Sequence, residues 1–474
     1  MNILIVGNGF DLSHYLPTKY DHFMDVMKAI EVKDLGEPIK EVFNNKVEDV
    51  PTLLLKVFEI KKAINEKTYE MNFDDLFKKS REKSFIEKTK EIYEINKVKI
   101  SFEQIVKIQY QLKKNGWYQY FKNHVEKITT WIDFEQKIEE VLVILATSVV
   151  KLENTEIDRY DYRQLDVSNL LSQKNINTLN FFGFSENVGG NIRLGTRIQA
   201  IPLQTYVNPR FCHGKNIDNG FSATAFLDFL HQELEEFIQI FNSYLELIID
   251  KLSSTCEFAI KTDEWIYPDK IFSFNYTNTY QKNYDSSIDT DYLHGSFGTK
   301  QNIVLGISEL HDDSLKKIKA YGFTKYHQKL FKDTQYLFLD KFKKKIQQDK
   351  KDIEELKRKV MMPLQSAFVK SVQSQLNEKM NSQCLDLNFY IWGHSLDVSD
   401  KDYILDLFSL NDDMDRNVRI TIYYFDKNAK FTLLNNLLSI LDKDKVEQWM
   451  KNKWLQFKPN PEIKFDEISS EKTA

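Results

Sequence analysis

Two kinds of apolar pattern alternate along this chain. Short runs that are apolar on both faces predict buried β-strands, and spacings of three and four residues predict amphipathic helices. Runs of the first kind occur at residues 1–6, 271–274, 292–293, 303–305, 389–392 and 420–424. Helical spacing is clearest at Phe134, Ile138, Val141, Leu142 and Leu145, and at Leu230, Leu234, Phe237, Ile238, Phe241 and Leu245. Continuous apolar strands separated by helices are typical of a parallel sheet covered on both faces, so we expect an α/β fold.

Glycine and proline interrupt regular structure, and their distribution divides the chain. The chain has no glycine from 37 to 115 or from 117 to 182, which predicts mostly helix. Residues 183–220 are rich in Gly, Asn, Pro and Arg, which predicts a long loop that acts as a lid or is simply a flexible connector. Nearly heptad apolar spacing after residue 338 predicts a charged helical hairpin.

These patterns predict a sheet domain that is discontinuous in sequence and carries large helical insertions. We expect its core to combine residues 1–25, 256–320 and 385–435. A helical insertion would occupy 26–255 and a helical hairpin 321–384. Residues 436–474 would form C-terminal helices and, after Trp454, a frayed tail.

Composition narrows the classes of function. The 474 residues contain 65 Lys and Arg against 70 Asp and Glu, a formal charge of -5, which disfavours non-specific nucleic-acid binding. Three widely spaced cysteines fit neither a disulfide framework nor a zinc site and favour a reducing compartment. No signal peptide and no apolar stretch of about eighteen residues is recognisable, so we expect a cytoplasmic protein that does not enter the membrane.

The segment Gly7 to Leu12 follows the first predicted strand and precedes a helix. In that context a glycine turn exposes backbone N–H groups to a phosphate, although a purely structural turn explains the glycines equally well. The segment is neither a complete G-x-G-x-x-G nor a Walker loop, since Leu12 replaces the third glycine and no G-K-[ST] follows.

Three other polar segments end predicted strands, where open α/β sheets bind ligands. Asn275 is suited to fix a ribose or a water, or it merely ends the strand. His294 is a candidate general base because its ordinary pKa lies near neutrality. The Gly393-His394-Ser395 segment does not fit a serine hydrolase, because Asp397 replaces the required glycine and no histidine follows His394. No metal-binding motif is present.

Taken together, the opening Ile3 to Leu12 with Leu16 to Tyr20, then Phe274 to Thr277, His294-Gly295 and Gly393 to Leu396 resemble the AbiH family of bacteriophage abortive-infection proteins. The resemblance spans the length of the chain. It implies a bacterial antiphage role, in which an infected cell is killed or arrested before the phage matures, and a phage-encoded trigger as a partner.

The order of these segments is also distantly similar to that of sirtuin-like domains, including NAD hydrolases that act against phages. This similarity implies a Rossmann-like, sirtuin-like sheet that binds NAD as a ligand or substrate. It implies that Asn275 orients the nicotinamide ribose and the attacking water and that His294 is the general base. Sirtuin-like domains usually carry Asp where this chain has Thr277, and Asp11 is our candidate for the missing carboxylate. The implied nucleotide contacts are Gly7, Asn8, Gly9, Phe10, Thr277, Gly295, Gly393, His394 and Ser395.

These observations favour hydrolysis of the N-glycosidic bond of NAD, with release of nicotinamide and without a bound prosthetic group or metal. One alternative is a sensor that binds a nucleotide without turnover, while a partner or a conformational change kills the cell. Another is a metal-dependent nuclease that uses Asp11, Asp133 and Glu135, which the basic stretch from Lys343 to Lys359 keeps open. An oligomer contact through the charged hairpin, giving a homo-oligomer, is an alternative to a hairpin that is merely solvated.

Overall fold

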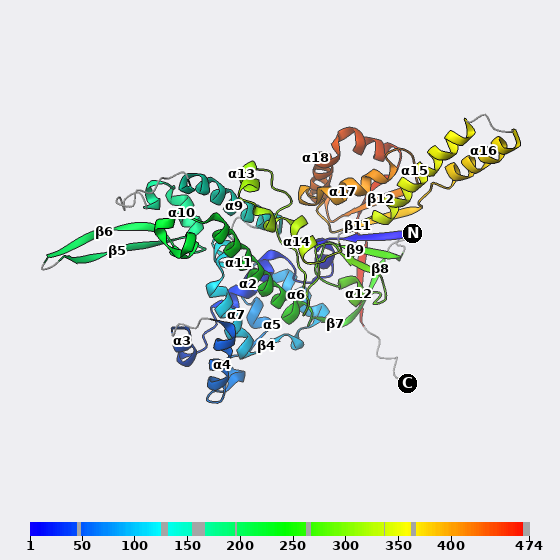
Figure 1. Ribbon diagram of the computed structural model, residues 1–474. Coiled ribbons are helices and arrows are strands. Elements are labelled where there is room, and N and C mark those ends of the chain that lie inside the picture. Colours follow the sequence, from blue (N-terminus) through cyan, green and yellow to red (C-terminus); the bar gives the residue numbers. More distant parts are fainter. Residues whose placement is uncertain are drawn as a thin grey trace. The chain divides into compact units, whose positions relative to one another are not determined.

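The computed structural model describes residues 1–44, 49–124, 131–153, 166–194, 197–261, 267–335, 337–361 and 366–467 (Figure 1). The chain forms two compact units, and each unit is discontinuous in sequence. The first combines Met1–His14, Cys256–Ser296 and Asp333–Ala474. The second combines Tyr15–Thr255 and Phe297–Lys332. Within the described residues, no helix is both long enough and apolar enough to cross a membrane.

The first unit is built on a six-stranded sheet in which every neighbouring pair is parallel. Its strands are β1 (Asn2–Val6), β9 (Lys270–Ser273), β10 (Thr290–Tyr292), β11 (Leu387–Trp392), β12 (Val418–Tyr424) and β13 (Leu455–Pro459), in the order β10-β9-β1-β11-β12-β13. The parallel α/β sheet expected from the apolar runs is therefore confirmed. Numbered along the chain, the strands follow the order 3-2-1-4-5-6, which is the order of doubly wound sheets that bind dinucleotides where the order reverses.

Both faces of this sheet are covered, which explains why its strands are apolar on both sides. One face, with Ile3 and Phe389, packs against α17 (Lys401–Phe408) and α18 (Lys427–Lys451). The other face, with Leu4 and Trp392, packs against α1 (Asn8–Ser13), α12 (Thr279–Asn283) and the antiparallel pair β8 (Cys256–Lys261) and β14 (Glu462–Glu467).

The C-terminal region differs from the prediction of a frayed tail. Residues 455–459 form β13, the sixth strand of the sheet, and β14 pairs with β8. Leu455 is buried but its neighbours alternate between polar and apolar types, as expected of an edge strand. This alternation hid the strand from a search for continuous apolar runs.

The strand predicted at 303–305 is also absent, and the segment belongs to the second unit. Ile303, Val304 and Leu305 are buried as the pattern implies. Side chains bind their backbone in place of a neighbouring strand. Gln328 accepts a hydrogen bond from the N–H of Leu305 and donates one to its carbonyl oxygen. Lys332 donates to the carbonyl oxygen of Ile303. An apolar run can thus be buried without entering a sheet.

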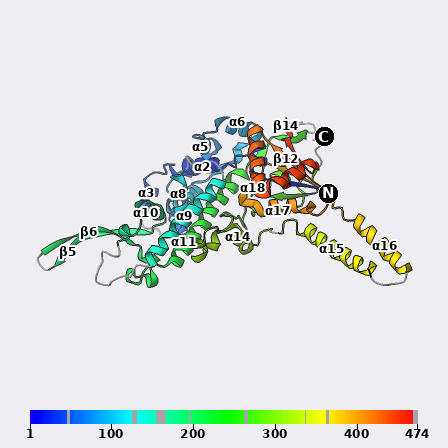
Figure 2. The same ribbon diagram turned by 90° about the horizontal axis from the view of Figure 1, so that it is seen from above.

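A pair of long helices extends away from the sheet of the first unit, drawn in yellow in Figures 1 and 2. These helices are α15 (Asp340–Val360) and α16 (Ser366–Asn381), and they pack against each other. Phe342 and Ile346, near the start of α15, pack against the core on the face of the sheet that α17 and α18 cover.

The second unit is mainly helical. Its helices are α2 (Tyr20–Glu31), α3 (Glu37–Asn44), α4 (Val50–Lys61), α5 (Phe73–Phe77), α6 (Lys83–Ile92), α7 (Phe102–Lys114), α8 (Gly116–Lys122), α9 (Trp131–Glu153), α10 (Gln173–Asn180), α11 (Ala223–Tyr244), α13 (Asp313–Lys317) and α14 (Lys325–Phe331). Short antiparallel pairs join β2 (Met71–Asn72) to β4 (Lys99–Ile100) and β3 (Tyr93–Glu94) to β7 (Ser253–Ser254). The helical spacings predicted around Phe134 and Phe237 are confirmed, and these two rings stack 5.2 Å apart in the core.

The segment predicted as a loop or lid at 183–220 is mostly a β-hairpin. Strands β5 (Ser185–Leu194) and β6 (Arg197–Val207) pair antiparallel, and their register shifts between Val188 and Gly190. Glycine inside a strand often marks such a bulge. The two glycines at 189–190 therefore signalled an irregular strand, which the prediction took for a loop.

Candidate functional site

The carboxyl edge of the parallel sheet collects all four polar segments that the sequence singled out. Helix α1, which directly follows β1, carries Asp11, and the turn after β9 carries Asn275. His294 follows β10, and His394 follows β11. These strands are neighbours, so segments separated by hundreds of residues in the sequence meet at one edge.

The glycines after β1 and β11 are required by close packing of two backbones. A Cβ atom at Gly393 would lie 2.1 Å from the amide nitrogen of Phe10, and Gly393 has a φ of +73°. A Cβ at Gly7 would lie 2.6 Å from the Cα of His394. The N–H of Gly9 donates to the carbonyl oxygen of Gly393 at 2.9 Å. Because that N–H and the N–H of Phe10 already bind backbone carbonyls, packing accounts for these glycines without a phosphate.

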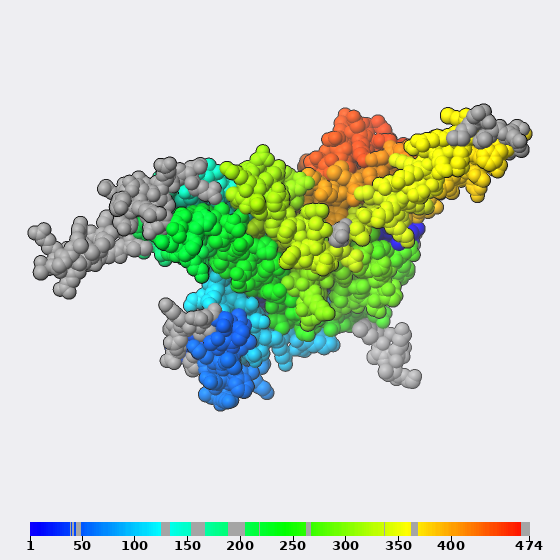
Figure 3. Space-filling view, viewed as in Figure 1, coloured from blue at the N-terminus to red at the C-terminus, as the bar shows by residue number. Residues whose placement is uncertain are grey.

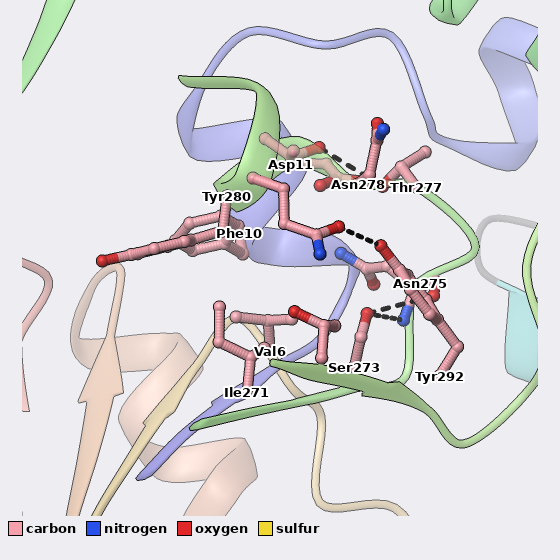
Figure 4. Close-up of a pocket in the computed structure, with 13 residues that line it drawn as sticks. Val6, Phe10, Asp11, Ile271, Ser273, Asn275, Thr277, Asn278, Tyr280 and Tyr292 are labelled. Atoms are coloured by element: carbon pink, nitrogen blue, oxygen red, sulfur yellow. Dashed lines mark hydrogen bonds between the residues drawn. The ribbon is translucent and has the colours of Figure 1, made fainter. Parts of the chain in front are cut away.

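Asp11 lies beside this junction and is almost completely buried (Figure 4). Its Oδ2 atom accepts a hydrogen bond of 2.6 Å from the hydroxyl of Thr277, and Thr279 in turn donates to the Thr277 hydroxyl at 3.3 Å. The Oδ1 atom is buried with no hydrogen-bond partner among the described residues. Burial raises the pKa of Asp11 to about 6, although the hydrogen bonds from the threonines oppose this shift. Asp11 therefore titrates close to neutrality.

Asn275 faces the same place from the end of β9. Its side-chain amide donates to the carbonyl oxygen of Gly7 at 3.0 Å, which fixes it against the first loop. The hydroxyl of Ser273 accepts the backbone N–H of Asn275 and donates to its carbonyl oxygen, so the turn is held rigidly. The nearby polar side chain of Asn275 also opposes the rise in the pKa of Asp11.

A small cavity lies between these groups, as Figure 4 shows. Its volume is about 10 Å³, close to the minimum of roughly 10–15 Å³ that one water requires. With the open space at its mouth included, the volume is about 240 Å³. The lining is Val6, Phe10, Asp11, Ile271, Ser273, Asn275, Thr277, Asn278, Thr279, Tyr280, Gln281, Thr290 and Tyr292.

The hydrogen bonds around the cavity determine what it can bind. The Tyr292 hydroxyl donates to Oε1 of Gln281 at 2.8 Å, so its oxygen retains lone pairs that can accept. Ionised Asp11 can only accept, and its Oδ1 has no described partner. A guest must therefore supply hydrogen-bond donors, as a water or a hydroxyl does. A phosphate, which mainly accepts hydrogen bonds, does not match these two groups.

A second polar cluster surrounds Asp400, which lies six residues after His394. Nε2 of His294 is 3.1 Å from Oδ1 of Asp400, and Nε2 of His394 is 3.5 Å from Oδ2. All three side chains are buried. The ring of Phe274 lies between them and the sheet, 4.1 Å from the His394 ring and 5.1 Å from the His294 ring. One carboxylate thus serves two imidazoles.

The backbone fixes the tautomer of His394. Its Nδ1 atom accepts the N–H of Leu396 at 2.9 Å, so neutral His394 carries its proton on Nε2, which faces Asp400. A carboxylate in this position orients an imidazole. Asp400 is therefore suited to hold both rings.

The two clusters lie on opposite faces of the sheet edge. Successive side chains of an extended segment point to opposite faces. Ser273 and Asn275 line the cavity with Asp11, whereas Phe274 contacts His294 and His394. The structure therefore brings Asn275 together with Asp11 and Thr277, and places His294 in a separate cluster with His394.

The other predicted contacts have local structural roles. Phe10 is buried in the core, where its ring meets the Trp392 ring edge-on at 5.1 Å. Asn8 is half-buried. Gly295 has a φ of +79° and closes the turn after β10 by donating to the carbonyl oxygen of Tyr292. Ser395 is exposed, and its carbonyl oxygen accepts from Asn436 of α18.

Sequence reasoning missed Asp400 and Thr279. The one signal for Thr279 is that it lies two residues after Thr277. Asp400 is the last residue of a 3₁₀ helix at Val398–Asp400 that follows a loop, so its pairing depends on a path that spacing does not reveal.

The residues of the nuclease alternative are separated between the units. Asp11 belongs to the first unit, whereas Asp133 and Glu135 belong to α9 in the second. Glu135 forms an ion pair of 2.9 Å with the buried amine of Lys325. Across the described residues, no group of three His, Cys, Asp or Glu side chains is arranged to hold a metal ion.

The fold and this site define a parallel α/β protein with a buried carboxyl group at the edge of its sheet. A family model described as "Bacteriophage abortive infection AbiH" matches residues 3–182 and 207–424, and the chain belongs to this family. The family name implies an antiphage role through abortive infection. The gap in the match covers nearly the whole β5–β6 hairpin. The searches of curated proteins and of solved structures found no match.

Proposed function

We propose that this protein acts in abortive infection by hydrolysing the N-glycosidic bond of NAD at the Asp11 cavity. The observation that carries the proposal is the buried Asp11 carboxyl group, whose Oδ1 has no described partner and whose pKa is about 6. Catalytic bases are most effective when their pKa lies near the working pH. A buried carboxylate that titrates there and faces a cavity is a strong candidate for such a base.

The strand order supports a dinucleotide as the ligand. The order 3-2-1-4-5-6 is that of Rossmann-like sheets, which bind dinucleotides at their carboxyl edge, and the Asp11 cavity lies at this edge. The similarity to sirtuin-like domains supplies NAD as the candidate. The hydrogen bond of 2.6 Å from Thr277 to Asp11 adds support, because it brings a carboxylate next to the position where those domains usually have Asp.

In this mechanism the cavity holds the attacking water. Its volume of about 10 Å³ suits a single water, and Asp11 accepts one of the water's protons. The oxygen of the water attacks the anomeric carbon of the ribose as the bond to nicotinamide breaks. Asn275, fixed on the carbonyl oxygen of Gly7, positions the water and the ribose. Nicotinamide leaves with the electron pair of the broken bond.

The cavity is too small for the whole substrate. Ordinary ligand pockets occupy roughly 300–1,000 Å³, more than the 240 Å³ that includes the open mouth. The dinucleotide therefore lies across the edge of the sheet, with only the reacting end of its ribose at the mouth. Because the cavity groups accept hydrogen bonds, they favour the ribose hydroxyls and the water over the pyrophosphate.

The test is to incubate purified full-length protein with NAD, alone and with phage lysate, and to measure nicotinamide by chromatography. We expect nicotinamide and ADP-ribose as products. Asp11→Asn keeps the shape of the side chain but removes the base, so turnover should fall by about 10²- to 10⁴-fold. Asp444→Asn is the matched control, because Asp444 is exposed on α18 of the same unit, and it should leave turnover unchanged.

Turnover that survives both Asp11→Asn and Asn275→Ala would place the reaction elsewhere. Saturable binding of NAD without any product, with and without lysate, would make the protein a nucleotide sensor and contradict the hydrolase. Binding is measured by calorimetry on the same preparations.

A further inference from the structure

Positive charge is concentrated in the α15–α16 hairpin. Residues 340–381 contain eleven Lys and Arg and six Asp and Glu, a net charge of +5. The whole chain carries -5, so the remainder carries -10. The hairpin extends from its unit as an arm, and Figure 3 shows much of its surface open to solvent. It is therefore a basic arm on an acidic protein.

One side of α15 attaches the arm to its unit. Phe342 and Ile346 pack against the core, and Ile353 is buried further along the same side. Lys343 forms an ion pair of 2.6 Å with Asp406, and Lys350 forms one of 3.2 Å with Asp413. This side is occupied by contacts within the protein.

The opposite side of α15 is exposed and basic. At about 100° of rotation per residue, one arc of about 140° holds Lys341, Lys344, Lys345, Lys351 and Arg358, all of which are exposed. Lys344, Lys351 and Arg358 follow one another at intervals of seven residues, or about 10.5 Å along the axis. No ion pair to a described residue occupies these five side chains.

The acidic residues of the same arc do not neutralise it. Asp352 forms an ion pair of 2.8 Å with Lys379 of α16, and Glu355 forms one of 2.6 Å with Lys359. Both carboxylates thus pair with cations other than the five exposed ones, and Lys379 is shared with Asp349. Asp340 is at the first position of the helix, where a negative charge is favourable.

We propose that this basic arc binds the phosphate backbone of double-stranded nucleic acid. A row of cations spread over about 20 Å matches an extended polyanion better than a compact anion. The arc contains no apolar residue, whereas helices that lie on membranes bury an apolar face beside their basic one. The net charge of the chain disfavours non-specific binding by the whole protein, so binding depends on this arm.

The test measures the anisotropy of fluorescent 20-base-pair DNA and RNA duplexes with the full-length protein between 50 and 200 mM salt. We expect binding of at least one duplex, weakening steeply with salt. The variant Lys344→Glu, Lys351→Glu, Arg358→Glu should raise Kd at least tenfold. It should also reduce the slope of log K against log salt by about 3, since each phosphate contact contributes about 0.9.

The matched control is Lys67→Glu, Lys78→Glu, Lys79→Glu, which makes the same change in net charge at exposed positions of the second unit. It should retain most of the affinity. Equal losses in the two variants would show a response to net charge alone and overturn the proposal. So would binding to phosphatidylglycerol vesicles but to neither duplex. Asp11→Asn should bind duplex like the wild type, which separates this inference from the hydrolase proposal.

Discussion

The two polar clusters at the edge of the sheet differ in what surrounds their buried carboxyl groups. Around Asp400, one carboxylate meets two imidazoles, and the backbone fixes the tautomer of His394. Around Asp11, Thr277 donates to one carboxyl oxygen, and the other is buried without a described partner in the wall of a cavity. Burying a carboxyl group in this way is costly unless a guest binds it.

The difference indicates where chemistry is more readily performed. In the Asp400 cluster, each carboxyl oxygen lies within 3.5 Å of an imidazole nitrogen, so a ligand would have to compete with both rings. The Asp11 cluster has an acceptor without a described partner, and the raised pKa of Asp11 makes it responsive near neutral pH. In the proposed hydrolysis we therefore assign the attacking water to the Asp11 cluster. To Asp400 we assign only the orientation of the His294 and His394 rings. The following predictions test this assignment.

The largest effect is expected at Gly393, which lies between the clusters. In Gly393→Ala the new Cβ would lie 2.1 Å from the backbone of Phe10, and neither backbone can move without disturbing a cluster. We expect the free energy of unfolding of the first unit to fall by more than about 4 kcal/mol, seen as a lowered Tm or loss of folded protein.

Gly214→Ala is the control for the backbone angle alone. Gly214 also has a positive φ, of +61°, but its Cβ would approach only the side-chain nitrogen of Asn219, at 3.2 Å. Gly214→Ala should lower the free energy of unfolding by about 1–3 kcal/mol. Similar losses in both variants would mean that the close approach of the two loops contributes nothing.

The next effect concerns stability in Asp11→Asn. The folded pKa of about 6 is above the ordinary value of 3.8, so the folded state holds the proton more tightly than the unfolded state. Asp11 therefore destabilises the fold increasingly as the pH rises from 3.8 to about 6. Removing its charge should stabilise the protein by about 2 kcal/mol at pH 5 and about 3 kcal/mol at pH 8.

Calorimetry of both proteins at the two pH values measures this change as a difference in Tm. The Asp444→Asn control should show no such dependence on pH. A constant difference between the wild type and Asp11→Asn would show that Asp11 is not a buried titrating group.

The sequence predicted the sheet better than it predicted the site. Buried parallel strands carry their own signal, because both faces must be apolar, and β1, β9, β11 and β12 were found in this way. The apolar run at 303–305 carried the same signal, although Gln328 takes the role of a neighbouring strand there. Such compensation by one distant side chain cannot be read from spacing.

The site was predicted as a set of strand ends but not as two clusters. Parallel strands bring their carboxyl ends to one edge, so the neighbourhood of Asp11 and Asn275 followed from the fold. Which face each side chain takes depends on where the strand ends. β9 ends at Ser273, so Asn275 faces the cavity and Phe274 faces the histidines. The partnership with Asp400 requires the path of the loop after β11, which no pattern encodes.

The smallest expected effect is on the pH profile of NAD hydrolysis, and it distinguishes most directly whether the base lies in the Asp11 cluster or in the Asp400 cluster. If Asp11 is the base, kcat/KM for NAD should rise with pH around a midpoint near 6, and activity at pH 5 should be about tenfold below the plateau. Asp400→Asn removes the carboxylate that orients His294 and His394, so it should lower the plateau by about tenfold while leaving the midpoint in place. A midpoint that moves in Asp400→Asn would assign the titrating base to the histidine cluster, because Asp400 is not among the groups that set the pKa of Asp11.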